Sequence, residues 1–205
     1  MNKSQPFGSF DYSQIISLID QGAKVLDLGC GNGELLMRLK QEKNVSGTGV
    51  DKEEAMILEC IQRGISVFQG DLDEGLRDYQ DGSYDYVILN RTLQMVSNPV
   101  FLLREMIRVG HKAIVNFPNF GYIINRLQLG FQGKMPVNKK IPYEWHDTPN
   151  IHFCTRKDFT RLCHEEGIHI IKKIDLHNGK RTSALFPNLF ATEVCFVLSG
   201  NTKNG

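Results

Sequence analysis

Short apolar runs alternate with amphipathic stretches through the first 118 residues of the chain. Apolar runs bounded by turn residues predict buried strands, and they fall at Lys24–Leu28, Val45–Val50, Ser66–Gln69, Tyr84–Leu89 and Lys112–Phe117. Stretches with helical spacing of apolar residues separate them, from Gly33 to about Gln41, at Glu53–Arg63 and at Pro99–Val109. This alternation predicts parallel βαβ units, and strands that are apolar throughout predict a sheet covered on both faces.

The alternation stops at Asn119, where an irregular insertion of about residues 119–155 begins. It is rich in proline, with Pro136, Pro142 and Pro149, and only a short helix is expected in it, near Tyr122–Leu129. A connection this long inside a compact domain is usually a lid, a binding surface or a disordered segment.

Regular structure resumes at Thr155. Thr155 and Asp158 have the spacing of a capping box, which predicts the start of a helix, and Gly167 stands where a glycine ends one. Two more apolar runs, Ile168–Ile174 and Glu193–Leu198, bring the predicted strands to seven. We therefore expect an α/β fold with a doubly wound, mostly parallel, seven-stranded sheet, in a single domain of residues 1–205.

Composition narrows the classes of protein to consider. The formal net charge is +1 and no basic stripe is visible, which disfavours a nucleic-acid partner. The five cysteines are widely spaced and form no C-x-x-C, so neither a disulfide framework nor a zinc site is expected. The first 12 residues are polar and no apolar run approaches the ~20 residues of a membrane span. We expect a cytoplasmic protein without membrane contact.

The chemistry concentrates in V-L-D-L-G-C-G-N-G at Val25–Gly33, which leads from a predicted strand directly into a helix. Glycines such as Gly29 and Gly31 let a backbone turn tightly and approach a ligand. Asp27 ends the strand and is placed to receive a positively charged amino group. Asp51 closes the second strand about 20 residues later, the position from which a carboxylate binds two ribose hydroxyls.

A nicotinamide dinucleotide is the alternative ligand for this arrangement. Its fingerprint, G-x-G-x-x-G, brings a helix N-terminus to a pyrophosphate. Here the third glycine, Gly33, comes one place early, and Glu34 adds negative charge where a diphosphate would lie. S-adenosylmethionine (SAM) has no phosphate and carries a cationic sulfonium, so the acidic motif favours SAM or S-adenosylhomocysteine.

The remaining cofactor-binding candidates follow the predicted strands. Asp71 is placed to accept the adenine amino group and Leu72 to line the ring, while Asn90 and Arg91 should lie below the methionine end. Neighbours of the two main carboxylates, Cys30 and Lys52, are assigned to the same site. Each residue taken singly is equally a loop or capping residue, and for Asp71 alone that is the better interpretation.

The chain resembles the class I SAM-dependent methyltransferases over Ile15–Ser199 and, more narrowly, the methionine biosynthesis protein MetW family. The similarity lies in Val25–Gly33, N-R-T-L-Q-M-V-S-N-P at 90–99, R-V-G-H-K-A-I-V-N-F-P-N-F-G at 108–121, G-K-M-P-V at 133–137 and P-Y-E-W-H-D-T-P-N-I-H-F-C-T at 142–155. The resemblance implies a Rossmann-like methyltransferase fold and SAM-binding roles for Asp27, Gly29, Gly31, Asp51 and Asp71. It also implies a protein partner, homoserine O-acyltransferase, and no catalytic residue.

Whether the chain is an enzyme stays open. Tyr143, His146, Asp147 and His152 are candidates for a base facing the ligand, or they hold the proline-rich loop in place by hydrogen bonds. The spacing of His146, His152 and Cys154 matches no zinc pattern, so no metal is expected. Asn116–Asn119 is similar to the N-P-P-Y signature of amino-group methyltransferases but lacks its second proline and follows the fifth strand, which indicates a simple turn.

The insertion also mixes cationic and aromatic residues: Arg126, Lys134, Lys139 and Lys140 with Phe131, Tyr143 and Trp145. Such a loop either docks on an acidic protein surface or is a solvated loop with a few rings turned inward. The family resemblance implies an accessory or regulatory partner of homoserine O-acyltransferase. The alternatives are a methyltransferase of an unidentified small molecule and a nicotinamide-dependent oxidoreductase.

Overall fold

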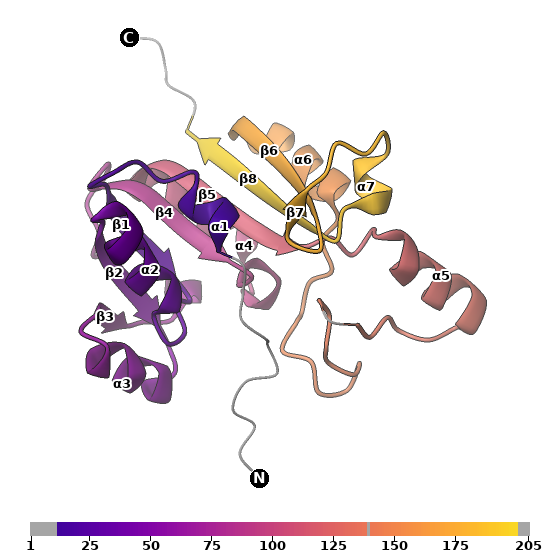
Figure 1. Cartoon of the computed structure of the whole chain (residues 1–205), viewed down its shortest axis with the longest axis horizontal. Coiled ribbons are helices and arrows are strands. Elements are labelled where there is room, and N and C mark those ends of the chain that lie inside the picture. Colours follow the sequence, from indigo (N-terminus) through magenta and orange to yellow (C-terminus); the bar gives the residue numbers. More distant parts are fainter. Residues whose placement is uncertain (1–11, 139, 201–205) are drawn as a thin grey trace.

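A computed structural model describes residues 12–138 and 140–200, so Lys139 and the two ends lie outside the description. One sheet of eight strands runs through it in the order β3-β2-β1-β4-β5-β8-β6-β7 (Figure 1). The strands are β1 Lys24–Leu28, β2 Ser46–Asp51, β3 Ser66–Gln69, β4 Tyr84–Asn90, β5 Gly110–Pro118, β6 His169–His177, β7 Lys180–Arg181 and β8 Glu193–Ser199. The first five pair in parallel, whereas β8 runs antiparallel between β5 and β6.

Helices cover both faces of the sheet. The main helices are α2 Glu34–Lys43, α3 Glu54–Gln62, α4 Pro99–Val109, α5 Ile123–Gln132 and α6 Arg156–Glu165. The short helices are α1 Ser13–Ile16, η1 Leu72–Glu74, η2 Leu93–Met95 and α7 Pro187–Phe190. Helices α1, α2 and α3 pack on one face, and α4 and α6 pack on the other.

Alternation along the central strands explains these two layers. On β1, Val25 belongs to the cluster under α2, while Leu26 and Leu28 belong to the cluster under α4. On β4, Ile88 belongs to the cluster under α2 and Leu89 to the cluster under α4. Strands buried on both faces are apolar at most positions, which is the pattern that made them recognisable, and the buried Asp27 is an exception on β1.

The predicted α/β fold with its mostly parallel sheet is confirmed. The bounds predicted for β1, β3 and α4 match those observed, and other predicted elements differ by a few residues at their ends. The sheet has one strand more than the seven expected, because the two-residue β7 pairs with β6. Among the described residues, no helix is long and apolar enough to cross a membrane.

Helix starts follow their capping residues. Asn98 accepts a hydrogen bond from the Phe101 amide at 3.1 Å, and Pro99 occupies the first turn of α4. Thr155 likewise accepts from the Asp158 amide at 3.2 Å, as the capping-box spacing predicted.

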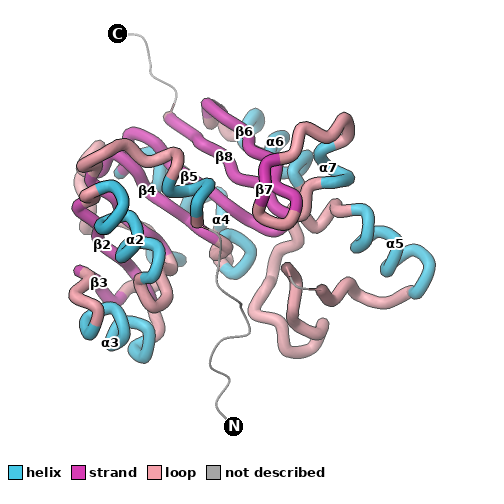
Figure 2. The backbone as a smooth tube through the Cα atoms, in the orientation of Figure 1, coloured by secondary structure: helices cyan, strands magenta, loops and turns pink. Residues whose placement is uncertain are grey.

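The insertion leaves the sheet at the end of β5, and α5 projects away from the body of the molecule (Figures 1 and 2). Asn119 follows Pro118, the last residue of β5, and is fully buried, whereas residues 116–118 of the expected turn belong to the strand itself. Its amide donates to the carbonyls of Asn188 and Ala191, and its oxygen accepts from the amides of Gly121 and Arg156. Asn125 and Asn138 form further hydrogen bonds in this loop, so asparagines hold it, whereas the side chains of His146, Asp147 and His152 make no hydrogen bond to the described residues.

Candidate functional site

A cavity of about 560 Å³ opens at the carboxyl ends of β1, β2 and β4, where the strand order reverses direction. All nine residues assigned to the cofactor line it: Asp27, Gly29, Cys30, Gly31, Asp51, Lys52, Asp71, Leu72 and Asn90. The topology brings these residues together from four loops, because every parallel strand delivers its last residue to the same edge.

The glycine turn after β1 forms the floor of the cavity. Gly29 and Gly31 have φ values of +68° and +53°, in the left-handed region. A Cβ on Gly29 would lie 2.6 Å from the Thr92 hydroxyl oxygen, whereas one on Gly31 would meet nothing within 4 Å. Gly29 is therefore required by packing as well as by conformation, and Gly31 leaves its backbone open beside the cavity.

Asp51 joins this turn to the start of α3. One carboxylate oxygen accepts from the Gly31 amide at 2.8 Å and the other from the Glu53 amide at 3.0 Å. Both bonds fix the carboxylate at the cavity wall, and each oxygen keeps a lone pair for a further donor. This geometry suits the role of a ribose ligand that the sequence assigned to Asp51.

Asp27 is the most deeply buried carboxylate of the site, with 2% of its surface exposed. No hydrogen bond or ion pair joins it to another residue in the described part of the chain. Burial, and secondarily the charge of Asp51, raises the pKa of Asp27 to about 8. A buried carboxyl without a partner favours a cationic ligand, which would restore the charged form.

Most of the charged residues in the lining are acidic. Seven carboxylates line the cavity, namely Asp27, Glu34, Asp51, Glu53, Glu59, Asp71 and Asp73, against two cations, Lys52 and Arg91. A diphosphate would be repelled in such a site, and a sulfonium or ammonium would be attracted. Burial, and next to it Asp27, raises the pKa of the Cys30 thiol well above its usual range, so this thiol stays neutral.

Two further predicted ligands, besides Asp51, also have structural partners. Asp71 accepts from the Asp73 amide at 3.0 Å and so caps η1, which was the simpler interpretation of this residue. Asn90 accepts from the Asn116 amide at 2.8 Å, which leaves the amide nitrogen of Asn90 available to the cavity.

The sequence did not predict an ionic cluster that lies beside the cavity. The buried carboxylate of Glu193, on β8, pairs with Arg91 and with Lys140 of the insertion. Burial acts to raise the pKa of Glu193, but the two cations outweigh it and hold that pKa below its usual range. Nothing in the local sequence signals this cluster, since its members lie 53 and 102 positions apart.

The insertion contributes little to the cavity itself. Pro149 is the residue of the insertion that lines the cavity. The candidate bases Tyr143, His146, Asp147 and His152 are not among the lining residues. Burial, and then Asp147 and Glu53, raises the pKa of Tyr143, which lowers the fraction of phenolate that could act as a base near neutral pH. The described residues contain no group of three His, Cys, Asp or Glu side chains that could hold a metal ion.

Comparisons with known proteins give the site its context. A family model described as "Methionine biosynthesis protein MetW" matches residues 9–198. The "Bifunctional methionine biosynthesis protein MetXA/MetW" of Rhodopirellula baltica is 38% identical over 182 residues, which is 83% of this chain but 29% of that protein. The chain thus spans less than a third of this relative's length.

Solved structures show the same fold. A SAM-dependent methyltransferase from Archaeoglobus fulgidus has a TM-score of 0.68 at 18% identity, over 91% of this chain and 90% of that one. An S-adenosylmethionine-dependent methyltransferase from Mesorhizobium loti has a TM-score of 0.68 at 16% identity, over 93% of this chain and 98% of that one. The fold expected from the sequence is that of class I methyltransferases.

Proposed function

The chain belongs to the family of the methionine biosynthesis protein MetW, and we propose that it binds SAM or S-adenosylhomocysteine and serves as an accessory or regulatory partner of homoserine O-acyltransferase. The observation that carries the ligand is the acidic cavity of about 560 Å³ with the unpaired, buried Asp27 at its base. We assign Asp27 to the ligand's ammonium, Asp51 to the ribose hydroxyls and Asp71 to the adenine amino group.

Shape supports the same assignment. Leu72, next to Asp71 in the sequence, and Met56 line the cavity and supply apolar surface for an adenine ring. Gly31 lets the ligand approach the backbone closely, while Asn90 and Arg91 lie toward the strand end that would hold the methionine portion. The excess of carboxylates argues against a dinucleotide in the same place.

The partner assignment rests on the bifunctional relative, which joins MetXA and MetW in one protein by its name. Proteins that work together are often joined in this way, and we take MetXA to be the homoserine O-acyltransferase that the family resemblance implies. Five free cysteines and the metabolic role suit a reducing cytoplasm, where we place the complex.

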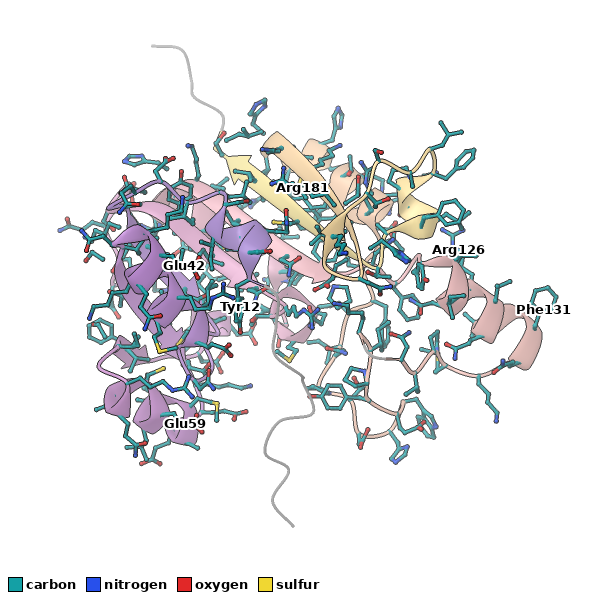
Figure 3. The ribbon with its side chains drawn as sticks, in the orientation of Figure 1. Tyr12, Glu42, Glu59, Arg126, Phe131 and Arg181 are labelled. Atoms are coloured by element: carbon teal, nitrogen blue, oxygen red, sulfur yellow. The ribbon has the colours of Figure 1, made fainter. Side chains whose placement is uncertain are left out.

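The insertion is the surface we assign to that partner. Phe131, on α5, is 85% exposed and Trp145 is 73% exposed, so both rings are accessible to a partner. Figure 3 shows Phe131 at the outer end of α5, with its ring pointing away from the body of the molecule. Large aromatic side chains of this kind anchor protein interfaces.

Two measurements test these assignments separately. Isothermal calorimetry with S-adenosylhomocysteine and with NAD tests the ligand assignment. Tight binding of NAD without binding of S-adenosylhomocysteine would overturn that assignment. Homoserine O-acyltransferase turnover, with and without this chain and SAM, tests the partner. The Phe131→Ser/Trp145→Ser variant should lose the effect, whereas Phe68→Ser, which changes a side chain 58% exposed on β3, should keep it.

The intact cavity also favours a second candidate, a SAM-dependent methyltransferase acting on an unidentified small molecule. Methyl transfer depends mainly on alignment of the acceptor, so the lack of a base in the lining does not oppose it. Consumption of SAM by the chain or its complex with any acceptor of a broad panel would favour this candidate.

A further inference from the structure

A second, smaller cavity of about 250 Å³ lies beside the first. Residues 91–96 form part of both walls, because Thr92 and Met95 line the larger cavity while Leu93 and Gln94 line the smaller one. Likewise, Pro149 lines the larger cavity and Asn150 lines the smaller one. The other walls come from the end of β5, from the insertion and from α6.

The lining of this second cavity contrasts with that of the first. No Asp, Glu, Lys or Arg is among its lining residues, and the rings of Phe117, Phe120, Phe153 and Phe159 dominate it. A charged ligand would leave water there without gaining an Asp, Glu, Lys or Arg counter-charge. Apart from Gln94, Asn150, His152 and Cys154 the lining side chains are apolar, so the cavity favours an uncharged, largely apolar molecule.

One buried polar atom of a lining residue lacks a partner. The side-chain oxygen of Gln94 is buried and accepts no hydrogen bond from the described residues. The rest of Gln94 is fixed, since its side-chain nitrogen donates to the Arg91 carbonyl and its own carbonyl accepts from the amides of Ile151 and His152 at 2.9 and 3.0 Å. An acceptor held in this way, buried and unpaired, is stabilised by a ligand that donates to it.

We propose that this cavity binds an uncharged small molecule of about the size of one substituted ring, which donates a single hydrogen bond to the Gln94 oxygen. The size follows from the volume, since a dry cavity of roughly 150 Å³ accommodates benzene. The proposal does not depend on SAM binding, because no carboxylate of the first cavity takes part in it.

Phenol and anisole are matched probes, since both carry one aromatic ring and only phenol has a hydroxyl donor. We would titrate each into protein with labelled leucine and isoleucine methyl groups and follow the signals by NMR. Ile141 and Leu162 report on the second cavity, and Leu35 reports on the first. Phenol should shift the Ile141 and Leu162 signals and bind about tenfold more tightly than anisole.

Two variants sharpen the test. Gln94→Met removes the acceptor at similar size and should abolish the preference for phenol. Leu162→Trp fills the cavity and should reduce phenol binding at least about tenfold, whereas Arg161→Trp adds the same ring to an exposed position of α6 and should not. The proposal is wrong if phenol leaves Ile141 and Leu162 unshifted, binds no better than anisole, or binds Leu162→Trp unchanged.

Discussion

Glu193, buried at the start of β8, forms an ion pair with Lys140 of the irregular insertion. The same carboxylate pairs with Arg91, which lines the large cavity. The insertion, the cavity wall and the sheet therefore meet at a single carboxylate. Any change in how the cavity holds Arg91 acts on the group that also holds Lys140, which gives the proposed SAM site a physical connection to the proposed partner surface.

Replacing this carboxylate should destabilise the protein and loosen the insertion. Glu193→Gln leaves Arg91 and Lys140 without their counter-charge, and we expect a loss of about 2–3 kcal/mol, somewhat below the ~3–5 kcal/mol of a fully buried pair because Lys140 keeps partial exposure. Urea unfolding measures the loss, and hydrogen exchange should show faster exchange in residues 119–155.

The pH dependence of that variant has a defined sign. The pKa of Glu193 is lower in the folded protein than in the unfolded chain, so its contribution is present above the unfolded value and disappears as pH falls through the folded one. The difference between wild type and Glu193→Gln should shrink in acid. Glu42→Gln, which removes an exposed pair with Arg38, should change stability by less than about 1 kcal/mol at any pH.

Asp27→Asn should stabilise the empty protein while removing its ligand affinity. The folded pKa of Asp27, about 8, lies above the unfolded value of 3.8, so ionisation costs stability increasingly between these pH values and by a constant amount above them. We expect a gain of about 1–3 kcal/mol at pH 8 and little gain at pH 4. Thermal unfolding at both pH values tests this, with the exposed Asp78→Asn as control; equal stability of wild type and Asp27→Asn at pH 8 would contradict the burial argument.

Ligand binding should release a proton. Because Asp27 is mostly protonated below pH 8 in the empty site, pairing with the ligand's ammonium requires that proton to leave. Affinity for S-adenosylhomocysteine should then fall by up to about tenfold per pH unit below pH 8. Calorimetry at pH 7 in phosphate and in Tris should give different heats for wild type and the same heat for any residual binding by Asp27→Asn. Equal heats for wild type would remove Asp27 from the ammonium site.

The sequence predicts part of this picture for specific physical reasons. Val25–Leu28 and Tyr84–Leu89 are apolar except for Asp27 and Asp85 because both faces of the sheet are covered, and the topology then brings Asp27, Asp51 and Asn90 to one edge without further information. The ionic cluster was not predictable, since burial of Glu193 makes sense only with partners that are distant in sequence. Helices of four residues, such as α1 and α7, are too short to leave a periodic pattern.

A series of three glycine variants separates conformation, packing and ligand contact in the turn after β1. Gly64→Ala, outside this turn, is the reference, because Gly64 has a φ of +67° and open space around it. Alanine there should lower the stability by about 1–2 kcal/mol through its backbone conformation alone. Gly29→Ala, at nearly the same φ, adds the 2.6 Å contact with Thr92 and should lose clearly more stability in urea unfolding. Gly31→Ala should match Gly64→Ala in stability, since its methyl group meets no protein atom within 4 Å, yet it should weaken S-adenosylhomocysteine binding because that methyl group lies beside the cavity. If Gly31→Ala bound the ligand as well as wild type, the ligand would not approach this turn, and the assignment of the cavity to SAM would lose its support.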